Sequence, residues 1–93
     1  GQKPLAIVGK AVTYDTGGLG LKPGEGMVDM HLDMSGGAMA MHSLFAIAKL
    51  GLKQNVVAII PATENAIGKD AYRNGDILTS MSGKTIEVRH TDA

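Results

Sequence analysis

Two continuous apolar segments restrict the fold of this chain more than any other feature. Leu5–Val8 and Val56–Ile60 contain only aliphatic residues, which is typical of strands buried on both faces of a parallel sheet. Between them, residues 37–50 carry apolar side chains at helical spacing, with Ser35 as a candidate N-cap and Gly51 as the residue that ends the helix. This order of strand, helix and strand predicts an α/β fold with a right-handed βαβ unit.

Shorter patterns divide the rest of the chain into extended segments and loops. Residues 11–14 and 30–34 are predicted to be extended, and residues 77–79 and 85–88 are predicted to pair as a hairpin. The Gly-rich stretch 16–26 is predicted to be a loop. Residues 63–76 are polar and also expected to be loop. The apolar face expected on the helix comprises Ala38, Met41, Leu44, Phe45 and Ala48.

Composition excludes several classes of protein. The chain has 93 residues, which suffices for one small domain, and it has no cysteine for a disulfide or a thiolate metal site. Its net charge is zero, which argues against a nucleic-acid partner. No apolar stretch approaches the about 18 residues of a membrane span, and the first residues lack the apolar core of a signal peptide. These features are compatible with a cytoplasmic protein.

Three acids each follow a predicted extended segment: Asp15, Asp33 and Asp92. Ligands of open α/β sheets gather beyond strand ends, where Lys10 and Lys22 are also expected. Convergent carboxylates repel one another unless a cation or a proton lies between them, and hard divalent cations prefer oxygen ligands. The residues alone therefore leave two alternatives, a carboxylate metal site or ordinary surface charges, with Asp33 stabilising the start of the helix.

Long motifs decide between these alternatives. The chain resembles the M17 family of leucyl aminopeptidases along nearly its whole length, in the family's order and spacing. The segments that carry the resemblance are VGKAVTYDTGGLGLKP at 8–23, GMVDMHLDMSGGA at 26–38, PATEN at 61–65, GDILTSMSGKTIEV at 75–88 and TDA at 91–93.

The resemblance implies a fold, a set of cofactors and a set of site residues. Residues 1–93 would be part of a three-layer α/β catalytic domain with a mixed sheet, without the family's N-terminal domain and C-terminal remainder. Two divalent metal ions are implied, Zn²⁺ or Mn²⁺, with Mg²⁺ or Co²⁺ exchangeable at one site. The residues that match metal ligands are Lys10, Asp15, Asp33 and Asp92. Lys22 matches the catalytic lysine, which also contacts substrate, and Met30 matches a residue of the pocket for the substrate's N-terminal side chain.

The implied reaction is removal of N-terminal amino acids, with a leucine-type preference, from peptides. Asp15 would bridge the two metals, and Lys22 would stay charged to stabilise the developing oxyanion. Lys10 can ligate only as a neutral amine, so metal binding would release its proton and metal affinity would rise with pH. The resemblance also implies a cytoplasmic homohexamer.

The family's last motif continues beyond Thr-Asp-Ala into Glu-Gly-Arg, whose Glu bridges both metals and whose Arg is catalytic. A polypeptide of these 93 residues alone is therefore expected to bind metal weakly and to show little activity. His90 stands where the family usually has Asn, either as an extra ligand or as another hydrogen-bonding side chain.

Three other functions are compatible with parts of the sequence. The triplet Asp15-Thr16-Gly17 occurs in aspartic proteases, whose fold is almost all β. The Gly-rich loop at 16–26 suggests a phosphate- or nucleotide-binding module, although it lacks both common glycine patterns. The third alternative is a structural or interaction unit without chemistry of its own.

Overall fold

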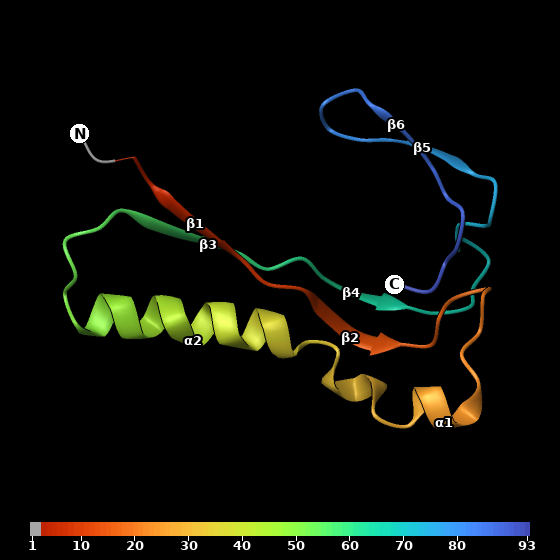
Figure 1. The fold of residues 1–93 in the computed structure, drawn as a ribbon, viewed down its shortest axis with the longest axis horizontal. Coiled ribbons are helices and arrows are strands. Elements are labelled where there is room, and N and C mark those ends of the chain that lie inside the picture. Colours follow the sequence, from red (N-terminus) through yellow and green to blue (C-terminus); the bar gives the residue numbers. More distant parts are fainter. Residues whose placement is uncertain (1–2) are drawn as a thin grey trace.

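Two parallel strand pairs placed end to end form the spine of the fold (Figure 1). The computed structural model describes residues 3–93. Strand β1 (Leu5–Val8) pairs with β3 (Val56–Ile59), and β2 (Ala11–Asp15) pairs with β4 (Ala62–Asn65). Backbone hydrogen bonds from Gly9 to Ile59 and from Ala11 to Pro61 bridge the gap between the two pairs. The strands predicted at 5–8, 11–14 and 56–60 are confirmed, and β4 corrects the expectation that 63–76 is entirely loop.

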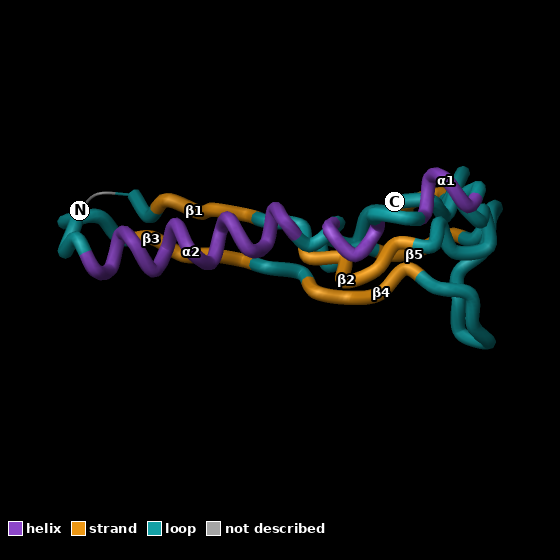
Figure 2. The backbone as a smooth tube through the Cα atoms, turned by 90° about the horizontal axis from the view of Figure 1, so that it is seen from below, coloured by secondary structure: helices purple, strands orange, loops and turns teal. Residues whose placement is uncertain are grey.

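Helix α2 (Ser35–Lys49) connects the strands and lies along one face of the spine, so the molecule is thin in the perpendicular view (Figure 2). The predicted α/β class and the parallel βαβ unit are confirmed. Gly51 follows the helix with φ +61°, as expected for a glycine at a helix end. Ser35 is not the N-cap. It is the first helical residue, and its hydroxyl donates to the carbonyl of Leu32.

The face of α2 that packs on the strands differs from the predicted one. Its buried residues are Gly37 and Ala40, while Met41 and Phe45 are 55% and 61% exposed. Small residues permit a closer approach than a stripe of large ones, so the helix contacts the spine through its Gly and Ala positions at this end. The predicted face was therefore rotated away from the true contact surface.

Glycines allow this close approach. A Cβ atom on Gly9 would lie 2.3 Å from the carbonyl oxygen of Gly36, and one on Gly37 would lie 2.6 Å from Ala11 Cβ. The backbone N–H of Gly37 donates to the carbonyl of Lys10 at 2.6 Å. The start of α2 is thereby fixed against the junction between β1 and β2, next to Lys10.

Two short helices precede α2, one at the end of the predicted loop 16–26 and one where an extended segment was expected. Helix α1 (Gly24–Met27) is followed by the short 3-10 helix η1 (Met30–Leu32), whose hydrogen bonds include Leu32 N–H to Asp29 and Asp33 N–H to Met30. The prediction of an extended segment at 30–34 was wrong. Alternating polarity resembled a strand there, but methionine and leucine favour helical backbone and no β-branched residue opposes it.

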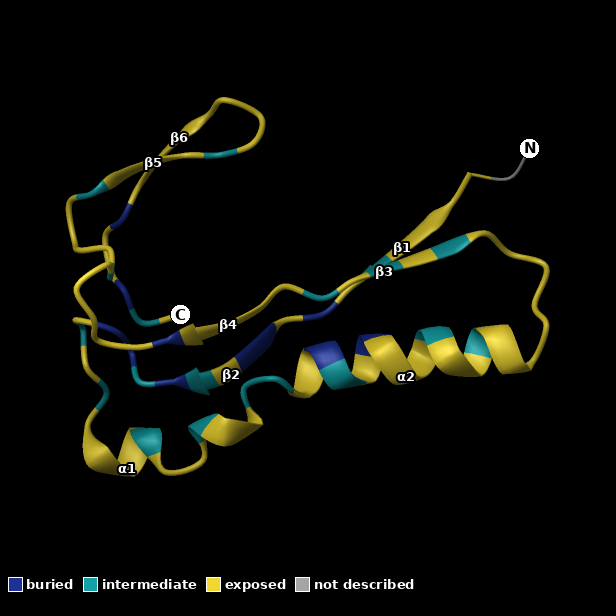
Figure 3. Cartoon of the chain, turned by 180° about the vertical axis from the view of Figure 1, so that it is seen from behind, coloured by how far each residue is buried: buried dark blue, intermediate teal, exposed yellow. Residues whose placement is uncertain are grey.

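Strands β5 (Ile77–Thr79) and β6 (Thr85–Glu87) form the predicted antiparallel hairpin, separate from the spine (Figure 1). Beyond β6 the chain returns as coil to the end of β4. Buried residues concentrate at β2, the start of α2 and this returning segment (Figure 3). By contrast, β1 and β3 are largely exposed, with Val8 at 67% and Ile59 at 54%, because α2 covers one face only. The prediction that both are fully buried was wrong for this chain.

No helix within residues 3–93 has the length and apolarity needed to cross a membrane.

Candidate metal and catalytic site

Asp15 lies at the carboxyl end of β2 and is almost completely buried, with 1% of its side chain exposed. Its Oδ1 atom accepts hydrogen bonds from the N–H of Gly17 at 2.9 Å and from Asn65 Nδ2 at 2.8 Å. Burial opposes ionisation of this carboxyl, but the two hydrogen bonds and the charges of Lys22 and Lys10 outweigh it and lower the pKa of Asp15. The carboxylate is therefore charged and held in one orientation.

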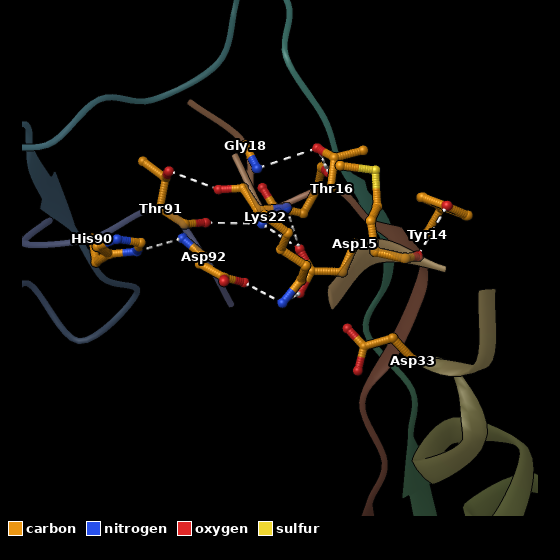
Figure 4. Close-up of polar contacts among 12 residues, drawn as sticks. Tyr14, Asp15, Thr16, Gly18, Lys22, Asp33, His90, Thr91 and Asp92 are labelled. Carbon is orange, nitrogen blue, oxygen red and sulfur yellow. Dashed lines mark hydrogen bonds and ion pairs between the residues drawn. The ribbon is translucent and has the colours of Figure 1, made fainter. Parts of the chain in front are cut away.

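Lys22 joins Asp15 to Asp92 (Figure 4). Its Nζ atom lies 2.7 Å from Asp92 Oδ1 and 3.8 Å from Asp15 Oδ2, and only 15% of its side chain is exposed. The Asp92 carboxylate is the main cause that raises the pKa of Lys22; burial opposes it, and the charges of Asp15 and Asp33 add to it. The lysine therefore stays protonated at neutral pH.

Lys10 and Asp33 form a second pair beside the first. Lys10 Nζ lies 2.7 Å from Asp33 Oδ2, and Figure 4 shows the Asp33 carboxylate on the side of Asp15 and Lys22. Asp33 follows η1 directly, so a helical turn presents its side chain, where a strand was expected. Asp92 likewise follows coil, since β6 ends at Glu87.

Two buried carboxylate oxygens of this cluster are held by ammonium groups. No backbone or uncharged side-chain group among the described residues donates to Asp33 Oδ2 or Asp92 Oδ1. Lys10 Nζ lies 2.7 Å from the first and Lys22 Nζ lies 2.7 Å from the second. Buried carboxylates are costly unless a cation is close, and a divalent ion is another partner that satisfies them.

The structure thus brings Lys10, Asp15, Lys22, Asp33 and Asp92 into one region of the molecule. Three carboxylates face two ammonium groups, so one negative charge is left uncompensated. Within residues 3–93, no three Asp, Glu or His side chains are close enough together to form a metal-binding group. Met30, the predicted substrate-pocket residue, lies half-buried in η1. The functional roles of these residues stay predictions.

Two uncharged residues that the sequence analysis did not single out connect the cluster. Asn65 Nδ2 donates to Asp15 and also to the carbonyl of Thr91 at 2.8 Å. The Thr91 hydroxyl donates to the Gly17 carbonyl at 2.8 Å and accepts from the Gly20 N–H at 2.7 Å. Their position inside the PATEN and TDA motifs is the sequence signal that could have revealed them.

The glycine loop after β2 binds its own chain. The N–H groups of Gly17, Gly18 and Gly20 donate to Asp15, to the Thr16 hydroxyl and to Thr91, respectively. A phosphate cradle needs such N–H groups free, so the loop is not built for a nucleotide. The aspartic-protease alternative also fails, because that fold is almost all β, whereas α2 has 15 residues and crosses between parallel strands.

His90 is a hydrogen-bonding residue in this structure. Its Nδ1 atom accepts the backbone N–H of Asp92 at 3.0 Å. The imidazole also lies against Gly20, since a Cβ there would come within 2.8 Å of His90 Cε1. This contact agrees with the second of the two roles expected for His90.

The fold and the site define an α/β unit with a carboxylate–lysine cluster where its parallel strands end, an arrangement found in metal-dependent hydrolases. Residues 1–93 match the family described as "Cytosol aminopeptidase family, catalytic domain". The chain belongs to this family, and the resemblance noted from its motifs is confirmed.

Individual relatives agree with this assignment. The chain is 53% identical over 92 residues to the probable cytosol aminopeptidase of Ralstonia pickettii, covering 99% of the chain and 18% of that relative. It is 55% identical over 91 residues to the cytosol aminopeptidase of Vibrio cholerae, covering 98% of the chain and 18% of the relative. The chain therefore spans about a fifth of the length of these relatives.

Solved structures show the same fold. Leucyl aminopeptidase from Trypanosoma brucei, in complex with actinonin, matches with a TM-score of 0.94 and 42% identity over 98% of this chain and 18% of that one. The bottromycin maturation enzyme BotP, in complex with Mn, matches with a TM-score of 0.89 and 40% identity over 96% of this chain and 20% of that one.

Proposed function

We propose that this chain carries most of the metal-binding and catalytic residues of a two-metal aminopeptidase. The observation that supports the proposal best is the convergence of three carboxylates, on Asp15, Asp33 and Asp92, on only two ammonium groups. They lie in a cluster with net negative charge, at the end of the parallel strands. The proposed metal ligands are Asp15, Asp33, Asp92 and Lys10.

The donor set fits divalent cations. Carboxylate oxygens suit Zn²⁺, Mn²⁺, Mg²⁺ and Co²⁺, and a neutral lysine amine adds one nitrogen ligand. Mn²⁺ is favoured for a first experiment, because the solved relative BotP was determined in complex with Mn. Lys10 Nζ lies 2.7 Å from Asp33 Oδ2, so the amine and this carboxylate would hold the same cation.

Each residue then has a separate role in peptide hydrolysis. When bound, the two divalent ions supply Lewis-acid polarisation of the scissile carbonyl and a water nucleophile at neutral pH. Asp15, which is fixed at Oδ1 by Gly17 and Asn65, has its Oδ2 3.8 Å from Lys22 Nζ. Lys22 keeps its proton and donates hydrogen bonds to the oxygen that becomes negative as the carbonyl is attacked.

The substrates follow from this arrangement. Peptides with a free N-terminus are proposed, because an uncharged α-amine can ligate a metal, whereas the delocalised nitrogen of an internal peptide bond is a poor ligand. A leucine-type preference is proposed, with Met30 lining the pocket for that side chain. A cytoplasmic location and a homohexamer are proposed on the basis of the family, and no nucleic-acid partner is proposed.

A polypeptide limited to these 93 residues is proposed to bind Mn²⁺ weakly and to turn over little substrate, because the family's bridging Glu and catalytic Arg come after the Thr-Asp-Ala motif. The activity test therefore belongs in the longest natural polypeptide that contains this chain.

The experiment measures hydrolysis of leucine 4-nitroanilide before and after removal of metal with a chelator. Activity should be lost on chelation and return with Mn²⁺, and the variant Asp15→Asn should not recover. Hydrolysis that survives exhaustive chelation, or that persists undiminished in Asp15→Asn, would refute the proposal. Glu87→Gln, an exposed acid in β6, is the matched control and should behave as wild type.

A further inference from the structure

The hydroxyl of Thr91 occupies a position that links the two proposed functional segments. It donates to the carbonyl of Gly17 at 2.8 Å and accepts the N–H of Gly20 at 2.7 Å, so one side chain satisfies two backbone groups of the glycine loop. Only 1% of Thr91 is exposed. Because the Thr91 side chain is buried, water cannot replace its hydroxyl without a change of structure.

The loop that Thr91 holds is the one that delivers Lys22. The N–H of Lys22 donates to the carbonyl of Thr16 at 2.9 Å, which closes the loop as a compact turn. Gly17 and Gly18 have φ values of +88° and +66°, which favour glycine. From outside the loop, Thr91 bonds to it at Gly17 and Gly20, and Asn65 bonds to it at Thr16.

The other side of Thr91 is held by the end of β4. Its carbonyl accepts a hydrogen bond from Asn65, the residue that also orients Asp15. The next residue, Asp92, has its carboxylate 2.7 Å from Lys22 Nζ (Figure 4). Thr91 therefore joins the loop that carries Lys22 directly to the segment that carries Asp92.

We propose that Thr91 is a positioning residue that acts through Lys22. Its hydroxyl bonds only to the glycine loop among the described residues, so its effect on the reaction would be indirect. By fixing the glycine loop it places the Lys22 ammonium where the oxyanion develops, an inference that rests on the proposed function. A misplacement of about 1 Å at a catalytic group can lower the rate about 100-fold.

Valine and serine separate the hydroxyl from the shape of the side chain. Thr91→Val keeps the shape and removes both hydrogen bonds, whereas Thr91→Ser keeps the hydroxyl. In the longest natural polypeptide that contains this chain, Thr91→Val should lower kcat for leucine 4-nitroanilide about 10- to 100-fold with little change in KM. Thr91→Ser should stay within about threefold of wild type.

A double-mutant cycle with Lys22→Ala tests whether Thr91 acts through Lys22. If it does, adding Thr91→Val to Lys22→Ala should cause no further loss of kcat. Independent, multiplicative losses overturn the inference. If Lys22→Ala lowers kcat and Thr91→Val does not, only the inference fails; if Lys22→Ala itself has no effect, the proposed role of Lys22 fails with it.

A second variant covers the case in which Thr91→Val does not fold. An alanine Cβ at Gly20 would lie 3.0 Å from Thr91 Oγ1 and 2.8 Å from His90 Cε1, so Gly20→Ala should push the loop off the hydroxyl. The control is Gly24→Ala, where a Cβ meets nothing within 4 Å. Gly20→Ala should lower kcat in the wild-type background but cause no further loss of kcat in the Lys22→Ala background. Gly24→Ala should not lower kcat. Additive losses overturn the inference.

Chemical labelling gives a readout that needs no activity. Lys22 is mostly shielded, so its acetylation by acetic anhydride, followed by mass spectrometry, should accelerate about tenfold in Thr91→Val or Gly20→Ala as the loop loosens. The exposed Lys84 in the hairpin turn serves as the internal reference. An unchanged ratio of Lys22 to Lys84 labelling contradicts the proposed positioning.

Discussion

Replacing Gly37 by alanine tests whether the close packing of α2 on β2 holds the candidate site together. An alanine Cβ would lie 2.6 Å from Ala11 Cβ and 2.9 Å from Ile60 Cγ2. Ordinary carbon–carbon contacts are about 3.5–4.0 Å, so the start of the helix must move by roughly 1 Å. Since Asp33 lies just before the helix, this movement should separate its carboxylate from Lys10.

Three effects determine the stability of Gly37→Ala. Overpacking costs about 1–3 kcal/mol, and alanine returns about 1 kcal/mol of helix propensity. The hydrogen bond from Gly37 N–H to the Lys10 carbonyl lengthens, which costs about 1 kcal/mol. The net loss is about 1–3 kcal/mol, and each kcal/mol lowers the melting temperature of a domain of this size by about 4–8 °C.

Thermal unfolding followed by circular dichroism measures the loss of stability. Mn²⁺ titration of the folded variant measures the effect on the site, and the Mn²⁺ affinity is expected to be about tenfold lower. Gly26→Ala in α1 is the control, because its Cβ would make only an ordinary contact of 3.6 Å with Pro23. A Gly37→Ala variant that melts no lower than wild type, with unchanged Mn²⁺ affinity, would refute the reasoning.

Three further predictions concern single side chains. Asp15→Asn should keep the fold, because an amide oxygen can still accept both hydrogen bonds at Oδ1, yet lose more than about 100-fold in Mn²⁺ affinity by calorimetry. Lys10→Met should weaken Mn²⁺ binding at least about tenfold if the amine is a ligand; stronger binding would instead show that the lysine acts as a competing cation. Leu44→Ala should lower the melting temperature of the 93-residue chain, whereas Phe45→Ala, on the exposed face of α2, should leave it nearly unchanged.

The elements of the spine were predictable because their signals are local. Leu5–Val8 and Val56–Ile59 are apolar β-type segments, and residues 35–49 have helical composition, so hydrophobic periodicity was enough. The hairpin was predictable because a Ser-Gly turn separates two short β-type segments.

The details that failed depend on contacts between segments. The face of α2 was mispredicted because large side chains such as Phe45 suggest burial, whereas close packing here selects Gly37 and Ala40. The exposure of β1 and β3 depends on which of their faces other segments cover. The composition of a strand alone does not give this information.

The candidate site was only partly predictable for a similar reason. Its charged members could be named from motifs, and the structure brings them together. Asn65 and Thr91 carry no charge, and their importance arises from hydrogen bonds that span 26 to 74 positions in sequence. Such bonds emerge only when distant segments are placed side by side.

The most direct test of the account is the position of bound metal. Crystals of the longest natural polypeptide that contains this chain, grown with Mn²⁺, would be measured for anomalous diffraction. The account predicts two anomalous peaks within ligand distance of Asp15, Asp33 and Asp92, and one of the peaks should also lie within ligand distance of Lys10 Nζ. Lys22 should stay beside Asp15 and Asp92, with no more than a rotation of its side chain. Fully loaded crystals in which the peaks lie elsewhere, while Lys10 and Lys22 keep their pairing with these acids, would contradict it.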